Sequence, residues 1–165
     1  MIGDGRPTSR APIAQLHSTL TYRLHTLHKL SDRVSQAAYI ADAEMSMSEG
    51  RCLAAVGAFE PLSINSLAHG ANLNKGQASR AAQSLVDAGL VRKHADDNDG
   101  RGVVLSLTPK GRARWKRVMR LIERRNREIF GCLSPDEQAR FGDALDRLIE
   151  QARADLGRLA SAKAD

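Results

Sequence analysis

The sequence predicts a mainly α-helical fold with one small β-hairpin, an α+β class. Apolar residues recur every three or four positions over most of the 165-residue chain, which is the period of amphipathic helices. Only two segments, LVRKHA and GVVLSLT, have the β-branched and partly alternating pattern of strands. Apolar residues make up 42% of the chain but aromatic residues only 4%, so we expect a core of Leu, Ala, Val and Ile.

The two ends of the chain predict long helices that pair between two copies. From Pro12 to about Ala43, after an arm over residues 1–11, one apolar stripe runs along a single helix. SPDE at residues 134–137 forms a capping box and opens another helix with near-heptad apolar spacing. The stripe residues are Leu16, Leu20, Leu24, Leu27, Leu30, Val34 and Ala38, then Phe141, Leu145, Leu148, Ala152, Leu156 and Leu159. Both stripes exceed what a small central domain can cover, which predicts a homodimer.

The middle of the chain contains three shorter predicted helices, then the hairpin and a longer helix. The helices span Ser46–Phe59, Ser63–Gly70, about Lys75–Ala88 and Pro109–Phe130, the last capped by Thr108. Asn74 and Gln77 have the spacing of a capping box, and Gly89 stands where a left-handed residue ends a helix. Two helices joined by a three-residue turn and followed by a hairpin are typical of a winged helix-turn-helix, whose second helix enters the major groove of DNA.

That second helix predicts an apolar inner face and a hydrogen-bonding outer face. Ala78, Ala81, Ala82 and Leu85 fall on the inner side of a helical wheel. Arg and Gln can each read a base edge in two-point contacts, so the expected DNA-binding residues are Lys75, Gln77, Ser79, Arg80, Gln83 and Ser84. Arg80, Gln83 and Gln77 are the candidates for bases, with Lys75 and Ser79 nearer phosphates. The alternative is a solvated face of an ordinary helix.

The loop DDNDGRG would form the tip of the wing. We expect Arg101 to enter the adjacent minor groove and Asp99 to orient it or a neighbouring basic residue. The alternative is a solvated turn rich in Asp, Asn and Gly.

From Leu62 to Gly111 the chain reads LSINSLAHGANLNKGQASRAAQSLVDAGLVRKHADDNDGRGVVLSLTPKG, and this resembles the DNA-binding core of the MarR family of bacterial transcriptional regulators. A looser match extends from about Ala14 to Leu159. The resemblance implies a homodimer, a palindromic operator in double-stranded DNA, and repression relieved by a small molecule. It divides the chain into a dimerisation helix over 12–45, a DNA-binding domain over 46–108, dimerisation helices over 109–160 and a tail over 161–165.

Three glycines depart from the family pattern. Gly76 lies in the recognition helix where family members often carry Ser or Pro, and Gly100 stands where a second wing arginine is common. Gly50 replaces a frequent aromatic residue in the second helix, which we expect to open space near the usual ligand pocket.

In proteins of this fold the ligand lies between the dimerisation helices and the winged domain. The residues expected to line such a site are His17, Tyr22, Arg23, His25, Arg51, Cys52 and Trp115. An arginine beside Tyr and His in an apolar crevice suits an aromatic carboxylate, because the guanidinium can hold the carboxylate in a two-point contact. The alternative for each residue is packing or exposure without a ligand.

Other kinds of sensing have weaker support in the sequence. His25 and His28 have a spacing that can share a metal, but no nearby carboxylate or cysteine completes a tetrahedral set, so we expect neither a metal nor a cofactor. Cys52 and Cys132 form no CxxC motif and are expected in the core. The run Arg112–Arg127 holds eight Lys or Arg residues; it is either a solvated helix face, a basic flank for DNA, or a contact for an anionic ligand such as an acyl-CoA phosphate.

The net charge of +6 suits nucleic acid, and no nucleophile-base arrangement or phosphate loop predicts an enzyme. No secretory or membrane-spanning segment is apparent, so we expect a cytoplasmic protein without membrane partners. The leading interpretation is a sequence-specific repressor. A nonspecific architectural DNA-binding protein and a winged-helix protein-interaction module remain as alternatives.

Overall fold

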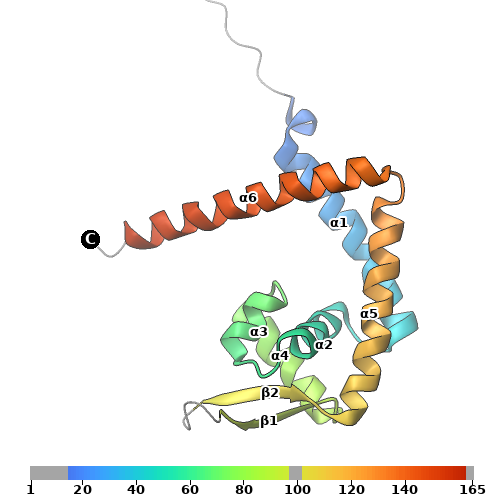
Figure 1. Cartoon of the computed structure of the whole chain (residues 1–165), viewed down its shortest axis with the longest axis vertical. Helices are drawn as coiled ribbons and strands as arrows, with labels where there is room; N and C mark the ends of the chain where they lie inside the picture. The colour runs from blue at the N-terminus through green and yellow to red at the C-terminus, as the bar shows by residue number, and fades with distance from the viewer. Residues whose placement is uncertain (1–14, 97–101, 163–165) are drawn as a thin grey trace, which may run out of the picture.

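The computed structural model describes residues 15–96 and 102–162 and shows a winged domain joined to long outer helices (Figure 1). In chain order the elements are η1 (Leu16–Ser18), α1 (Leu20–Ala38), η2 (Tyr39–Ala43), α2 (Met47–Phe59), α3 (Ile64–Gly70), α4 (Lys75–Asp87), β1 (Val91–Ala95), β2 (Val103–Leu107), α5 (Pro109–Phe130) and α6 (Pro135–Ser161). The predicted α+β class with one hairpin is confirmed.

The first helix is shorter than predicted. The expectation of one helix from Pro12 to about Ala43 was wrong at its start, whereas helical backbone does continue to Ala43; residues 12–14 lie outside the described part. Thr19 is extended, and its hydroxyl oxygen accepts from the backbone N–H of Tyr22, so α1 begins at Leu20. At the other end Tyr39–Ala43 form a π-helical turn that stops at the left-handed residue Glu44. The periodic spacing of apolar residues alone does not reveal such changes of helix type.

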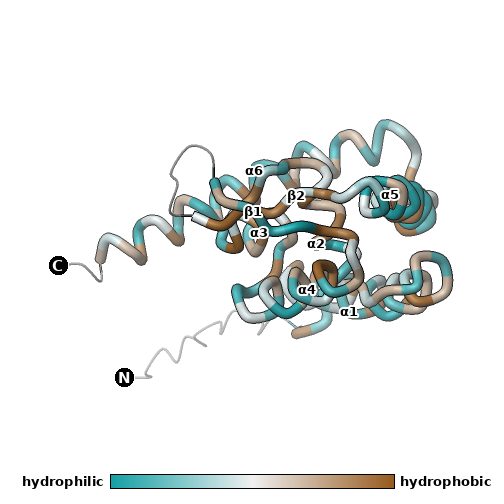
Figure 2. The backbone as a smooth tube through the Cα atoms, turned by 90° about the horizontal axis from the view of Figure 1, so that it is seen from below, coloured by the Kyte–Doolittle hydropathy of each residue, from teal (hydrophilic) through white to brown (hydrophobic). Residues whose placement is uncertain are grey.

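The core lies where α2, α3, α4 and the hairpin meet, and Figure 2 shows the hydrophobic segments gathered there. Leu53, Val56, Leu67 and Leu105 are fully buried, joined by Val118 from α5. The inner face expected for the recognition helix, Ala78, Ala81, Ala82 and Leu85, is buried in this core. Small alanines let α4 approach α2 and α3 closely, which fixes the recognition helix on the domain.

The hairpin is antiparallel and pairs Val91 with Leu107 and Ala95 with Val103. Gly89, with φ of +69°, ends α4 in the left-handed conformation that the sequence predicted and turns the chain into β1. The first turn of α5 then passes directly against the start of β1. A Cβ atom on Gly111 would lie 1.8 Å from the carbonyl oxygen of Leu90, so only glycine fits there.

The α6 helix packs very little against its own chain. Its N-terminus has the predicted capping box between Ser134 and Glu137, and the rings of Phe130 and Phe141, 5.9 Å apart, hold the turn from α5. None of its described residues is buried, and it extends across the top of Figure 1 away from the winged domain. Exposed apolar residues also follow α1; they include Leu20 at 73% and Leu30 at 55% exposure. Two helices with exposed apolar stripes need a partner surface.

Candidate nucleic-acid interface and effector cavity

The recognition helix α4 presents a polar outer face whose N-terminus is firmly capped. The side-chain oxygen of Asn74 accepts from the backbone N–H of Gln77 at 2.8 Å, and the Gln77 side chain accepts from the backbone N–H of Asn74 at 3.2 Å. Gln77 therefore has a structural role at the cap, and its amide N–H₂ remains for a ligand. Lys75, Ser79 and Arg80 are exposed on the same face.

Glu49 of α2 fixes the position of α4. One of its carboxylate oxygens accepts from the backbone N–H and the hydroxyl of Ser46, at 2.7 and 2.8 Å, which completes a capping box on α2. Its other oxygen accepts from the hydroxyl of Ser84 on α4. Desolvation raises the pKa of Glu49, but the hydrogen bonds from Ser84 and Ser46 outweigh it, so its pKa lies below the ordinary value. Ser84, predicted at the edge of the DNA face, is thus tied to α2.

Gln83 links the recognition helix to the wing. Its amide nitrogen donates to Asp87 at 2.7 Å, and its amide oxygen accepts from the ammonium of Lys93 on β1 at 2.6 Å. Both ends of the amide are engaged within the protein, which orients the side chain, and its second N–H and second lone pair remain for a base contact. The wing-tip candidates Asp99 and Arg101 lie outside the described residues.

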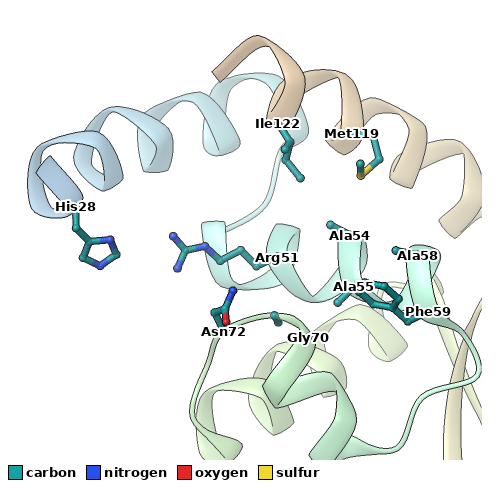
Figure 3. A pocket seen from close by; sticks show the side chains of 11 residues that line it. His28, Arg51, Ala54, Ala55, Ala58, Phe59, Gly70, Asn72, Met119 and Ile122 are labelled. Carbon is teal, nitrogen blue, oxygen red and sulfur yellow. The ribbon is translucent and has the colours of Figure 1, made fainter. Parts of the chain in front are cut away.

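A cavity of about 490 Å³ opens between α2, α5 and the α3–α4 turn (Figure 3). One end is polar, with Arg51, His28 and Asn72. The remaining wall is mostly apolar and is formed by Ala54, Ala55, Ala58, Phe59, Met119 and Ile122, with Gly70 and Ala71 at the turn. The volume falls within the range of roughly 300–1,000 Å³ that is usual for small-molecule sites.

The cation of this cavity is held by a carboxylate from α1. One guanidinium nitrogen of Arg51 donates to Asp32 at 3.1 Å, and the other carboxylate oxygen of Asp32 lies 3.4 Å from Nε2 of His28. A guanidinium has five N–H donors, and this bond uses one of them. Asp32 therefore orients Arg51 and leaves donors for an anion in the cavity. In Figure 3 the guanidinium lies between His28 and Asn72.

Of the residues expected at a ligand site, only Arg51 lines this cavity. Tyr22, Arg23, His17 and His25 are exposed along the N-terminal segment. Trp115 instead packs across α2, where its indole N–H donates to the carbonyl of Ala54 at 3.3 Å. The ligand role of these four residues of η1 and α1 remains a prediction.

Two expectations about α2 receive a physical answer. Cys52 is fully buried, and desolvation, helped by the charge of Glu49, raises its pKa to about 11. Its thiol is therefore protonated at neutral pH, which disfavours thiol sensing. Gly50 does not open space, contrary to expectation, because the ring of Tyr39 lies on it; a Cβ at Gly50 would stand 2.2 Å from Cε1 of Tyr39. The aromatic ring expected from the second helix is supplied here by η2.

Sequence reasoning missed Glu49 and most of the cavity wall. The signal for Glu49 was the spacing Ser46-x-x-Glu49, a capping box like those identified before α4 and α6. The signal for the wall was the run of small residues at positions 54, 55 and 58, at helical spacing from Arg51. In the sequence, Met119 and Ile122 are indistinguishable from ordinary core residues of a helix. Their position opposite α2 becomes apparent only in the folded chain. Within the described ranges no cluster of His, Cys, Asp or Glu could hold a metal ion.

Comparison with known proteins agrees with this geometry. A family model described as MarR family matches residues 44–102. A curated HTH-type transcriptional repressor of Mycobacterium tuberculosis is 26% identical over 116 residues, which covers 70% of this chain and 84% of the relative. A MarR family transcriptional regulator from Silicibacter pomeroyi is 27% identical with a TM-score of 0.71, over 83% of this chain and 91% of that one. A Mycobacterium tuberculosis MarR family protein in complex with salicylic acid is 25% identical with a TM-score of 0.65, over 79% and 96%.

A capped recognition helix next to a β-hairpin wing defines a DNA-binding transcriptional regulator of the winged helix-turn-helix class. Over residues 44–102 the chain matches the MarR family of these regulators, and over most of its length it is similar to members of that family. Members of this family bind DNA and are not enzymes, in accord with the sequence prediction. Over the residues that the structure describes, no helix has the combined length and apolarity of a membrane span.

Proposed function

We propose that this protein is a homodimeric repressor that binds a palindromic operator and leaves it when a small aromatic carboxylate enters the cavity between α2 and α5. The observation that carries the proposal is the division of this cavity into a cationic end at Arg51 and an apolar wall. An aromatic carboxylate matches both parts of the cavity, because its ring fits the apolar wall and its carboxylate pairs with Arg51.

The apolar wall suits an aromatic ring. Phe59 and Met119 offer an aromatic face and a polarisable thioether, and the alanines at positions 54 and 58 keep the space between them open. The relative bound to salicylic acid shows that a MarR family fold accommodates such a ligand. For the present chain this likeness supports the chemical class of the effector, and Arg51 supplies the charge that the class requires.

The α2 helix provides a route from the cavity to the DNA-binding face. Arg51 lies on its cavity side, and Glu49, two residues earlier, holds Ser84 of the recognition helix. A ligand that draws Arg51 away from Asp32 breaks the ion pair between α1 and α2. It thereby shifts α2, and α4 moves with α2 through the bond between Glu49 and Ser84. In this scheme the effector alters the placement of the two recognition helices in a dimer, and operator affinity falls.

The exposed apolar stripes on η1 and α1 and on α6 supply the dimer interface in this proposal. They comprise Leu16, Leu20, Leu24, Leu27, Leu30 and Val34 with Leu148, Ile149, Leu156 and Leu159. Side chains of this kind contribute roughly 1.5–3 kcal/mol each when fully buried, so a shared bundle stabilises the association strongly. The two-fold axis of such a dimer gives the palindromic symmetry of the operator.

The test is calorimetric titration of the purified protein with salicylate, benzoate and cinnamate, followed by operator-binding anisotropy at saturating acid. We expect saturable binding and a loss of operator affinity. Arg51→Gln should weaken carboxylate binding by about tenfold or more, since a charge-assisted pair is lost. Ala58→Leu fills the cavity without changing charge and should also abolish binding. Arg140→Gln, on the exposed side of α6, is the control and should bind normally.

Absence of binding by all three acids would refute the effector class. Equal affinity for the operator and for random DNA of the same length would instead favour the nonspecific architectural protein that the net charge of +6 also allows.

A further inference from the structure

The α5 helix carries an arginine stripe that the winged domain and the effector cavity do not use. Arg117, Arg120, Arg124 and Arg127 are spaced by three, four and three residues, which places all four on one face. With Asp42 of η2 and Leu121 they line a hollow of about 490 Å³. We call this the arginine hollow. In Figure 2, α5 is seen nearly along its axis on the right and is mostly hydrophilic.

Among the described residues, most arginines in this part of α5 have acidic partners, but three of the four in the arginine hollow do not. Between Arg112 and Arg127 there are seven, and four form ion pairs: Arg112 with Glu60, Arg114 with Glu44, Arg124 with Asp42, and Arg125 with Glu128. In the described ranges, Arg117, Arg120 and Arg127 make no hydrogen bond or ion pair, and all three are exposed walls of the arginine hollow. Like charges three or four residues apart repel one another and destabilise a helix. A bound anion would neutralise this repulsion along the stripe.

The charge and length of the hollow indicate the kind of anion. Four guanidiniums against one carboxylate give its lining a net charge of +3, and the carboxylate of Asp42 is already paired with Arg124. From position 117 to 127 the helix rises about 15 Å. This is longer than a single carboxylate or phosphate group needs, and it suits a ligand whose charges are spread along a chain. Arginine is also the side chain best matched to phosphate oxygens in two-point contacts.

We propose that the arginine hollow binds a small anion that carries several linked phosphate groups, such as a nucleoside triphosphate or an inorganic polyphosphate. The site is separate from the effector cavity, which lies on another side of α5 at Met119 and Ile122. The proposal does not depend on the identity of the effector.

The experiment is calorimetric titration of the full chain with inorganic tripolyphosphate and with ATP, and with inorganic phosphate as the single-group reference. The test variant is Arg120→Gln with Arg127→Gln. The control is Lys116→Gln with Arg140→Gln, which removes the same charge from exposed positions outside the hollow. Glutamine keeps the helix propensity of arginine, and a thermal melt of each variant verifies folding.

We expect one tripolyphosphate per protomer, bound far more tightly than phosphate. The test variant should lose about a hundredfold in affinity, or about tenfold for each charge-assisted contact, while the control stays within about threefold. Replacement of the same two arginines by lysine should give an intermediate loss. Tighter binding of ATP than of tripolyphosphate would identify a nucleoside as part of the ligand.

Three results would overturn the proposal. The first is an absence of saturable binding by either polyphosphate. The second is an equal loss in the test and control variants, which would mean diffuse attraction to net positive charge. The third is a loss of operator affinity in the test variant without any polyphosphate binding, which would make the stripe a DNA contact.

Discussion

The hydrogen bond between Glu49 and Ser84 makes a quantitative prediction about how the recognition helix is held. Ser84→Ala removes one hydroxyl that donates to a carboxylate at a partly exposed position. Bonds to charged groups contribute about 1.5–3 kcal/mol, and exposure places this one at or below the low end. The carboxylate keeps its two bonds from Ser46, so the variant leaves no charge without a partner. We expect the free energy of unfolding to fall by about 1 kcal/mol.

Glu49→Ala has a larger effect because the same carboxylate also completes the capping box of α2. Loss of a cap costs about 1 kcal/mol, so the single variant should lose about 2 kcal/mol. The double variant should lose about 2 kcal/mol as well, and not the 3 kcal/mol that independent sites would give, because the bridge is lost only once. The coupling energy is thus about 1 kcal/mol.

Urea unfolding at one fixed protomer concentration measures these energies, and operator anisotropy measures the consequence for DNA. Both single variants should weaken operator binding by a similar factor, and the double variant no further. Ser48→Ala, which removes another hydroxyl from the first turn of α2, is the control and should leave both quantities unchanged. Additive losses would refute the bridge. A loss of DNA affinity in Ser84→Ala alone would mean that Ser84 contacts DNA itself.

Three further predictions test the fold and the DNA-binding face. Gly111→Ala should cost about 3 kcal/mol or more in thermal or urea unfolding, because the added methyl meets the backbone of Leu90, whereas Gly142→Ala, with no atom within 4 Å, should be neutral or stabilising. Since hydrogen bonds lower the pKa of Glu49, its ionised form stabilises the fold at neutral pH. The free energy of unfolding of the wild type should therefore exceed that of Glu49→Gln at neutral pH. This difference should disappear as the pH falls below the ordinary pKa of 4.5 and through the lowered pKa of Glu49. Arg80→Ala should cost about 1–3 kcal/mol of operator affinity and relax preference at one base position, which binding to a set of single-base operator variants would show; uniform weakening over all of them would contradict base readout.

Local rules in the sequence predicted most of the elements. The capping boxes at Asn74 and Ser134, the left-handed Gly89 and the hairpin signals are all short-range features, and each appears in the structure. The error at the start of the chain has a local cause too. Thr19 is a good capping residue inside an apolar stripe, and periodicity alone gives no weight to such a residue.

The site was less predictable because its parts come from distant segments. Arg51 was identified from its charge in a helix near the expected pocket, but Asp32, which orients it, lies nineteen positions earlier on another helix. Glu49 and Ser84 are thirty-five positions apart, and no pattern within either helix indicates their contact. Tyr39 fills the space at Gly50 only because η2 turns the chain back on α2. Such contacts depend on the tertiary arrangement, which periodicity does not encode.

The central claim is that this protein binds one palindromic operator and that an aromatic carboxylate releases it. The most direct test is capture of sheared genomic DNA from the source organism by the purified protein, with and without salicylate, followed by sequencing. We predict a shared palindrome near a few promoters in the absence of the acid, and its loss at saturating acid. Uniform coverage of the genome, or an enriched palindrome that neither salicylate, benzoate nor cinnamate releases, would contradict the account.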